Sequence, residues 1–201
     1  MTKEDLVLLL SQLMKEEKAA AVVDRLLTEF GTADRVILAG ANSLMKVRGM
    51  DENATALLCL TVAIAARRRM ESFHVGQVYG ERDIARFLTG LFLGVPTEVI
   101  VMLSLDRERA FLGLDPLGSG TVNASSFNVR RAIELALRRG ASYVIFAHNH
   151  PSGSSTPSCE DLETTVILKD AFRTVDIAVL THFVMAGNSY DFVGGVSDLA
   201  P

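Results

Sequence analysis

Residues 148–161 read HNHPSGSSTPSCED and connect a predicted strand to a predicted helix. The strand covers residues 143–147, a short apolar run of the kind that is buried on both faces of a sheet. The helix covers residues 158–173, and the hydroxyl of Ser158 is suited to cap its first turn. Glycine, proline and small polar residues fill the interval and predict a loop. A strand, a loop and a helix in this order indicate an α/β fold.

Three side chains of this stretch can bind a metal ion. His148 and His150 are two residues apart at the end of the strand, a spacing that turns both imidazoles to one side. Asp161 lies in the first turn of the helix and can face the same cavity. Two nitrogens and one carboxylate oxygen leave a fourth tetrahedral position for water, as in catalytic zinc sites. A zinc-bound water ionises near neutral pH and becomes a nucleophile.

Each of these features also has an ordinary structural explanation. A His-x-His pair is a weak signal on its own, and His148 and His150 would then be loop histidines at a strand end. Ser158 and Asp161 have the spacing of a capping box, in which both residues satisfy free amides at a helix start. What favours a metal site is that all four residues occur together with Pro151 within fourteen positions.

The segments on either side divide the chain into two predicted domains. Residues 73–201 continue the α/β pattern around a mixed sheet, with helices at 81–93 and 127–139 and strands at 99–105, 110–114, 177–185 and 190–193. Residues 1–72 have a helical rhythm instead, with leucine and valine at three-to-four spacing, and predict a small all-α module. Its stretch of helix end, Gly49-Met50-Asp51 and longer helix has the outline of a helix-hairpin-helix.

Composition and charge exclude several classes of protein. The 201 residues include only two cysteines and no Cys-x-x-Cys pair, which excludes a disulfide scaffold and a thiolate zinc finger and favours a reducing, cytoplasmic location. The apolar run at residues 6–10 is too short for an export signal or a membrane span, so we expect no membrane association. Residues 1–73 carry ten basic and ten acidic side chains, and the remainder supplies the net charge of −4. Neither part is the basic body expected of a protein that binds DNA through its phosphates.

The order His-x-His-Pro, six residues, Ser, two residues and Asp resembles the motif of the JAMM, or MPN-plus, zinc metalloproteases. The wording His-Asn-His-Pro-Ser-Gly, followed by Thr-Pro-Ser and Glu-Asp, is similar to the bacterial RadC-like branch of that family. The similarity extends over about residues 73–193, from Gly120-Thr121-Val122 upstream to Thr181-His182-Phe183 downstream. It implies an MPN-type (JAB) domain that binds one zinc ion through His148, His150 and Asp161.

The resemblance also implies two catalytic residues. The family motif includes a glutamate at the beginning of the first strand, a place that Glu98 holds here, and this carboxylate would move the proton of the metal-activated water. Without the resemblance, Glu98 would be an exposed strand-end acid. Ser158 would add to its capping role by donating a hydrogen bond to the oxyanion of the intermediate. We expect Asn149 to shape the loop and His182 to be a core histidine, with a contact behind a metal ligand as the alternative.

The function predicted from these features is that of a zinc-dependent hydrolase acting on a peptide or isopeptide bond, with a peptide or protein substrate of unknown identity. One alternative is a DNA-associated repair accessory protein, as the description of the RadC-like branch implies. In that branch a Gly-hydrophobic-Gly turn exposes amides to a DNA phosphate, and Asp51 places negative charge there, which argues against strong DNA binding. Another alternative is a metal-binding scaffold without turnover, against which Glu98 and Ser158 count. The sequence leaves the oligomeric state open.

Overall fold

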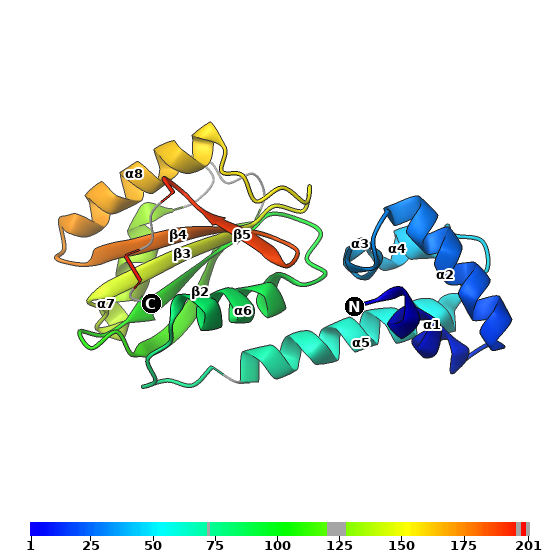
Figure 1. Ribbon diagram of the computed structural model, residues 1–201. Helices are drawn as coiled ribbons and strands as arrows, with labels where there is room; N and C mark the ends of the chain where they lie inside the picture. Colours follow the sequence, from blue (N-terminus) through cyan, green and yellow to red (C-terminus); the bar gives the residue numbers. More distant parts are fainter. Residues whose placement is uncertain (72, 120–127, 196–197, 200–201) are drawn as a thin grey trace. The chain divides into compact units, whose positions relative to one another are not determined.

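A computed structural model describes residues 1–71, 73–119, 128–195 and 198–199 of the chain. The chain divides into two compact units, Met1–Arg68 and Arg69–Pro201 (Figure 1). The first unit is all-helical and the second is an α/β unit built around one sheet. No helix in these described ranges is both long enough and apolar enough to cross a lipid bilayer.

The first unit consists of short helices around an aliphatic core. The helices are α1 (Lys3–Ser11), α2 (Glu16–Phe30), α3 (Ala33–Leu38), α4 (Ala41–Leu44) and α5 (Glu52–Glu71), the last of which continues into the second unit. Gly49, in the turn before α5, has a φ of 101°, and a Cβ there would lie 2.7 Å from the side chain of Val22. The Asp51 carboxylate accepts a hydrogen bond from the amide of Ala54 at 2.8 Å. The carboxylate of the chain itself therefore occupies the start of α5, where a phosphate would have to bind.

The second unit contains a five-stranded mixed sheet, as the sequence predicted. Its elements are α6 (Glu81–Phe92), β1 (Val99–Leu105), β2 (Phe111–Ser119), α7 (Val129–Arg139), β3 (Tyr143–Asn149), α8 (Cys159–Arg173), β4 (Ala178–Ala186) and β5 (Ser189–Phe192). The strand order is β2-β1-β3-β4-β5. Strands β3 and β4 are parallel, and the other neighbouring strands are antiparallel. The crossover between the two parallel strands is made by the loop at residues 150–158 and by α8, as a parallel pair requires.

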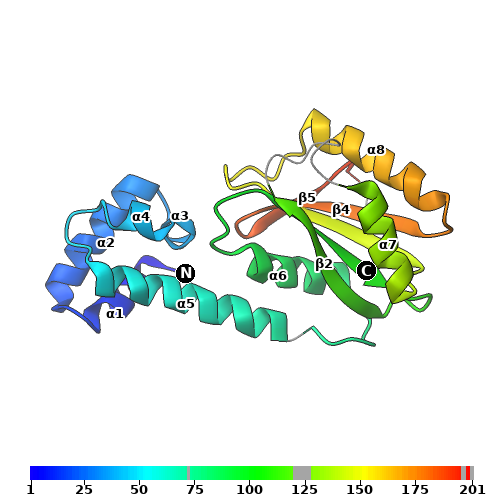
Figure 2. The same cartoon turned by 180° about the vertical axis from the view of Figure 1, so that it is seen from behind.

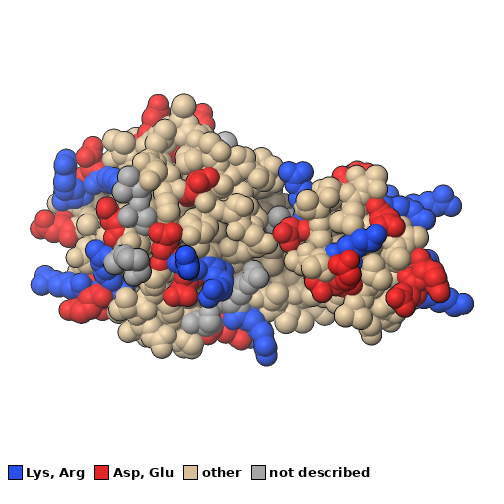
Figure 3. Space-filling view, in the orientation of Figure 1, with Lys and Arg blue, Asp and Glu red and all other residues tan. Residues whose placement is uncertain are grey.

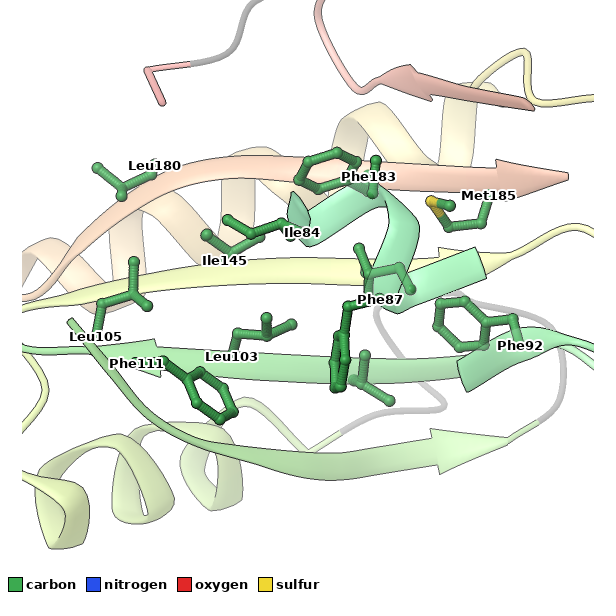
Figure 4. Packing of buried hydrophobic residues seen from close by; sticks show 14 residues of the cluster. Ile84, Phe87, Phe92, Leu103, Leu105, Phe111, Ile145, Leu180, Phe183 and Met185 are labelled. Atoms are coloured by element: carbon green, nitrogen blue, oxygen red, sulfur yellow. The ribbon is translucent and has the colours of Figure 1, made fainter. Parts of the chain in front are cut away.

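Helices cover both faces of this sheet, which explains why its central strands are largely apolar. Helix α6 packs on one face, and α7 and α8 pack on the other (Figures 1 and 2). Successive residues of a strand point to opposite faces, so Leu103 faces α6 whereas Met102 faces α7 and α8. On the α6 face, Phe87 and Ile84 lie among Leu103, Ile145 and neighbouring strand side chains (Figure 4). The sheet is thereby held between two hydrophobic layers.

Two predicted strands are longer in the structure than in the sequence analysis. Strand β3 continues to Asn149, because its last residues pair with β1 on one side and with β4 on the other, Ile100 with His148 and Asn149 with Met185. The prediction that His148 belongs to the loop was therefore wrong. Strand β2 extends to Ser119 rather than residue 114. Its acidic residue Asp115 is accommodated because the guanidinium of Arg139 binds both carboxylate oxygens, at 2.6 and 2.9 Å.

The start of α7 also differs from its prediction. The helix begins at Val129, and the side chain of Asn128 caps it by accepting a hydrogen bond from the amide of Arg131. The predicted start at residue 127 lies outside the described residues. Asparagine is favoured at the cap itself rather than inside the first turn, which explains the later start.

Candidate metal centre

Two histidines at the end of β3 point toward the first turn of α8. His148 belongs to the strand, and its side chain is completely buried. The backbone amide of His150 donates to the carbonyl of Met185 at 2.8 Å, which continues the pairing with β4 by one more residue. Because the chain is still extended there, both imidazoles lie on the same side of the sheet, as the sequence analysis expected.

The carboxylate of Asp161 is held in place by the cap of α8. Its Oδ2 atom accepts hydrogen bonds from the Ser158 amide at 2.8 Å and from the Ser158 hydroxyl at 2.7 Å. In return, the Ser158 oxygen accepts a hydrogen bond from the Asp161 amide at 3.1 Å. The capping box that was the ordinary alternative is therefore present. It does not compete with a metal site, because it leaves the other oxygen of Asp161 pointing at His148.

One ligand-type atom from each of these three residues lies within 4.8 Å of the other two. The Nε2 atoms of His148 and His150 are 3.0 Å apart. Asp161 lies 3.1 Å from the first through Oδ1 and 3.4 Å from the second through Oδ2. Zinc bonds of about 2.0–2.1 Å in a tetrahedron separate neighbouring ligand atoms by roughly 3.3 Å. His148, His150 and Asp161 therefore form a cluster that fits a small divalent cation.

Protonation in this cluster also favours a cation. The Nδ1 atom of His150 lies 2.8 Å from the carbonyl oxygen of Ser154, which can only accept a hydrogen bond, so Nδ1 carries a proton and Nε2 is the nitrogen that can bind a metal ion. Burial alone would raise the pKa of the Asp161 carboxyl. Hydrogen bonding and charge from His148, with hydrogen bonds from Ser158, instead hold this pKa well below its usual value. An ionised carboxylate beside two imidazoles is a donor set that suits a cation.

The structure places Glu98 at the same end of the sheet. Glu98 directly precedes β1, two residues before Ile100, which pairs with His148. Glu98 is half-buried. It is not a member of the three-residue ligand cluster.

Asn149 holds the segment that carries Glu98, through contacts that sequence reasoning did not identify. Its side-chain oxygen accepts a hydrogen bond from the amide of Val99 at 2.8 Å, and its side-chain nitrogen donates to the carbonyl of Thr97 at 3.0 Å. These bonds reach the residues directly before and after Glu98. The expectation that Asn149 shapes its own loop was incomplete, because it fixes a segment 50 residues away.

His182 lies directly behind His148. Its Nε2 atom is 2.9 Å from Nδ1 of His148, and its Nδ1 atom is 2.7 Å from the hydroxyl of Thr165. Burial, the largest influence, lowers the pKa of His182 well below its usual value. The ring is therefore neutral. His182 is thus a buried, hydrogen-bonded core histidine, as expected from the sequence, and it also lies behind the candidate ligand His148. Thr165 was missed because nothing local marks it.

The chain is similar in sequence to a known domain family and to several bacterial proteins. The sequence model of the RadC-like JAB domain matches residues 78–193, a range that includes the cluster and Glu98. A UPF0758 protein of Janthinobacterium sp. (strain Marseille) is 31% identical over 195 residues, covering 96% of this chain and 87% of that protein. A UPF0758 protein of Nitrosomonas eutropha is 34% identical and covers 86% and 77% of the two chains. A third, from Shewanella loihica, is 30% identical and covers 90% and 81%.

Proposed function

Because the chain belongs to the family of RadC-like JAB domain proteins, we propose that it is a zinc-dependent hydrolase of peptide or isopeptide bonds. His148, His150 and Asp161 would hold the ion. The observation that carries this proposal is the closeness of their ligand-type atoms: the two Nε2 atoms lie 3.0 Å apart, and the Asp161 carboxylate lies 3.1 Å from His148 through Oδ1 and 3.4 Å from His150 through Oδ2. Three such ligands leave one tetrahedral corner of a zinc ion for water. Two imidazole nitrogens and one carboxylate oxygen are also a donor set that zinc accepts readily.

The residues around the cluster would perform the proton transfers. When bound, zinc would lower the pKa of a coordinated water toward neutrality and polarise the scissile carbonyl. The Glu98 carboxylate would take the proton from the attacking water and later deliver it to the leaving amine. The Ser158 hydroxyl, which donates to Asp161 in the absence of substrate, would turn to donate to the oxyanion. Its capping contact from the Asp161 amide would remain during this turn.

The distribution of charge favours a protein substrate over a nucleic acid. On the face drawn in Figure 3, lysine and arginine side chains are interspersed with aspartate and glutamate. Binding through DNA phosphates needs clustered cations instead. At the start of α5, where the helix-hairpin-helix comparison would place a phosphate, Asp51 supplies its own negative charge. We therefore propose a peptide or a protein as the partner of the active site.

Removal and return of the metal tests this function. We expect the purified protein to bind one zinc ion per chain, measured by elemental analysis after dialysis against zinc buffered with a weak chelator. Hydrolysis should be assayed with a panel of quenched-fluorescent peptides and isopeptide-linked conjugates. A strong chelator should abolish cleavage, and stoichiometric zinc should restore it. Cleavage at the same rate by protein shown to be free of metal, or a zinc content near zero, would contradict the proposal.

The Asn149→Ala variant tests how the catalytic segment is held. Removal of its amide frees the residues on both sides of Glu98, and a displaced catalytic group costs about 10- to 100-fold in rate. We expect zinc content to remain at the wild-type value while kcat falls. Asn188→Ala, at an exposed position of the β4–β5 turn, is the matched control and should retain wild-type kcat. Equal kcat values for the two variants would exclude a positioning role for Asn149.

A further inference from the structure

A chain of buried hydrogen bonds connects His148 to the backbone of α8. It runs from Nδ1 of His148 to Nε2 of His182 at 2.9 Å, and from Nδ1 of His182 to the Thr165 hydroxyl at 2.7 Å. The Thr165 hydroxyl donates in turn to the carbonyl oxygen of Asp161, also at 2.7 Å. The side chains in this series of hydrogen bonds come from β3, β4 and α8, and all of them are buried. The series therefore connects His148 to Asp161, two of the residues that form the cluster.

The direction of every proton in this chain is fixed by its last member. A carbonyl oxygen can only accept, so the single hydroxyl proton of Thr165 is used on Asp161. The Thr165 oxygen must then accept from His182, which places the one proton of this buried, neutral ring on Nδ1. Nε2 of His182 is left as an acceptor for the proton on Nδ1 of His148. In the neutral form of His148, Nε2 is then the nitrogen without a proton, and it faces His150 and Asp161.

We propose that Thr165 and His182 are positioning residues that set the tautomer of His148, so that its Nε2 atom is always ready to bind the metal. This inference rests on the proposed metal centre, since the tautomer of His148 matters to function only if His148 binds a metal ion. Metal-binding histidines commonly donate their second ring nitrogen to a carboxylate or a carbonyl group. A second histidine in that place can either accept or donate, so a further group must choose for it. Thr165 fixes His182 as the acceptor from His148, because the Thr165 hydroxyl donates its own proton to the backbone carbonyl of Asp161.

Loss of the Thr165 hydroxyl should reverse the direction of the hydrogen bond between His182 and His148. Nδ1 of His182 would then have no acceptor, and a buried unpaired N–H group is destabilising. The His182 proton can instead sit on Nε2 of His182 and be donated to Nδ1 of His148. For this, the proton of His148 must move from its Nδ1 to its Nε2. That proton would point at Asp161, into the position of the metal, and would have to be displaced before binding. Weaker metal binding is the consequence.

The zinc affinity of two Thr165 variants tests the proposal. Competition with a chelating indicator should show that Thr165→Val binds zinc about 10- to 100-fold more weakly than the wild type, the usual effect of losing a contact behind a ligand. Thr165→Ser retains the hydroxyl and should bind as the wild type does. Thr164→Val is the matched control. It removes a neighbouring buried hydroxyl that has no hydrogen-bond partner within the described part of the protein, and it should leave affinity unchanged.

A second measurement reads the tautomer without any metal. Nitrogen-15 NMR of the zinc-free full-length chain, labelled at histidine, should show the proton of His148 on Nδ1 in the wild type and on Nε2 in Thr165→Val. A pair of variants at the other position complements it. The amide oxygen of His182→Gln can accept from His148 and should preserve affinity, whereas His182→Leu should not.

These measurements distinguish failure of the hydrogen-bond relay, from His148 through His182 to Thr165, from failure of the proposed metal centre. If Thr165→Val had the same His148 tautomer and the same zinc affinity as the wild type, Thr165 and His182 would not set the tautomer, and the proposed metal centre would be unaffected. A wild-type protein that binds no zinc would overturn the proposed function instead, and the tautomer of His148 would still decide whether the relay exists.

Discussion

Replacement of His150 by alanine is expected to remove zinc from the protein while the fold survives. The change deletes one of three ligand atoms, and its effect should exceed the roughly 100-fold upper range for contacts behind a ligand. His150 is the suitable member of the cluster for this test, since 13% of its side chain is exposed against 0% for His148 and 3% for Asp161. Its removal therefore leaves the strand core and the cap of α8 in place.

The measurement is zinc content after dialysis against a zinc buffer, together with the thermal unfolding midpoint of the metal-free protein. His74→Ala is the matched control, because it deletes an exposed histidine outside the cluster. We expect His74→Ala to retain one zinc ion and His150→Ala to retain almost none, with similar midpoints in the absence of metal. Equal zinc content in the two variants would refute the ligand role of His150.

Glu98→Gln is expected to have the opposite pattern, with zinc retained and turnover lost. Glutamine has nearly the same size as glutamate but does not accept a proton at neutral pH. General acid–base catalysis contributes about 10²- to 10⁴-fold to a rate, and kcat should fall by that amount. Because Glu98 is not one of the three clustered ligands, the affinity for zinc should change little.

The control for Glu98→Gln is Glu160→Gln, which neutralises an exposed carboxylate next to Asp161 in the sequence. This variant reports any effect of charge alone near the cluster, and we expect it to have wild-type kcat. Both variants are assayed on the same cleavable peptide at saturating zinc. Full turnover by Glu98→Gln would show that another group moves the proton. Loss of zinc from Glu98→Gln would instead make Glu98 part of the metal site.

The ligand cluster was accessible to sequence reasoning because all of its residues lie within fourteen positions. The spacing of His148 and His150 follows from the alternation of an extended chain, and Asp161 follows from the rules for helix caps. Both are local rules that act over a few residues. Glu98 could not be found in this way, since 50 residues separate it from His148, and only the resemblance to a family indicated it.

Local patterning also predicted the helices and strands of the α/β unit, as in α6, β1 and α8, and the all-helical character of the first unit. It did not predict how far β3 and β2 extend. A polar residue such as Asn149 has little intrinsic preference for a strand, and it is held there by its neighbours, Met185 on β4 and the Val99 amide on β1. Pairing between strands is a contact between distant parts of the chain, which no short window contains.

The amino-acid order alone therefore sufficed for the candidate metal ligands, the cap that holds Asp161 and the α/β pattern. Only the tertiary structure decided three features. These are the burial of His148, the hydrogen bonds of Asn149 to the residues beside Glu98, and the contact of His182 with His148. The relay spans separations of 34 and 17 residues along the sequence. The physical reason is that periodicity and capping depend on bonds within one or two turns of chain. The protonation of a buried histidine depends on every group packed against it, whatever its distance in sequence.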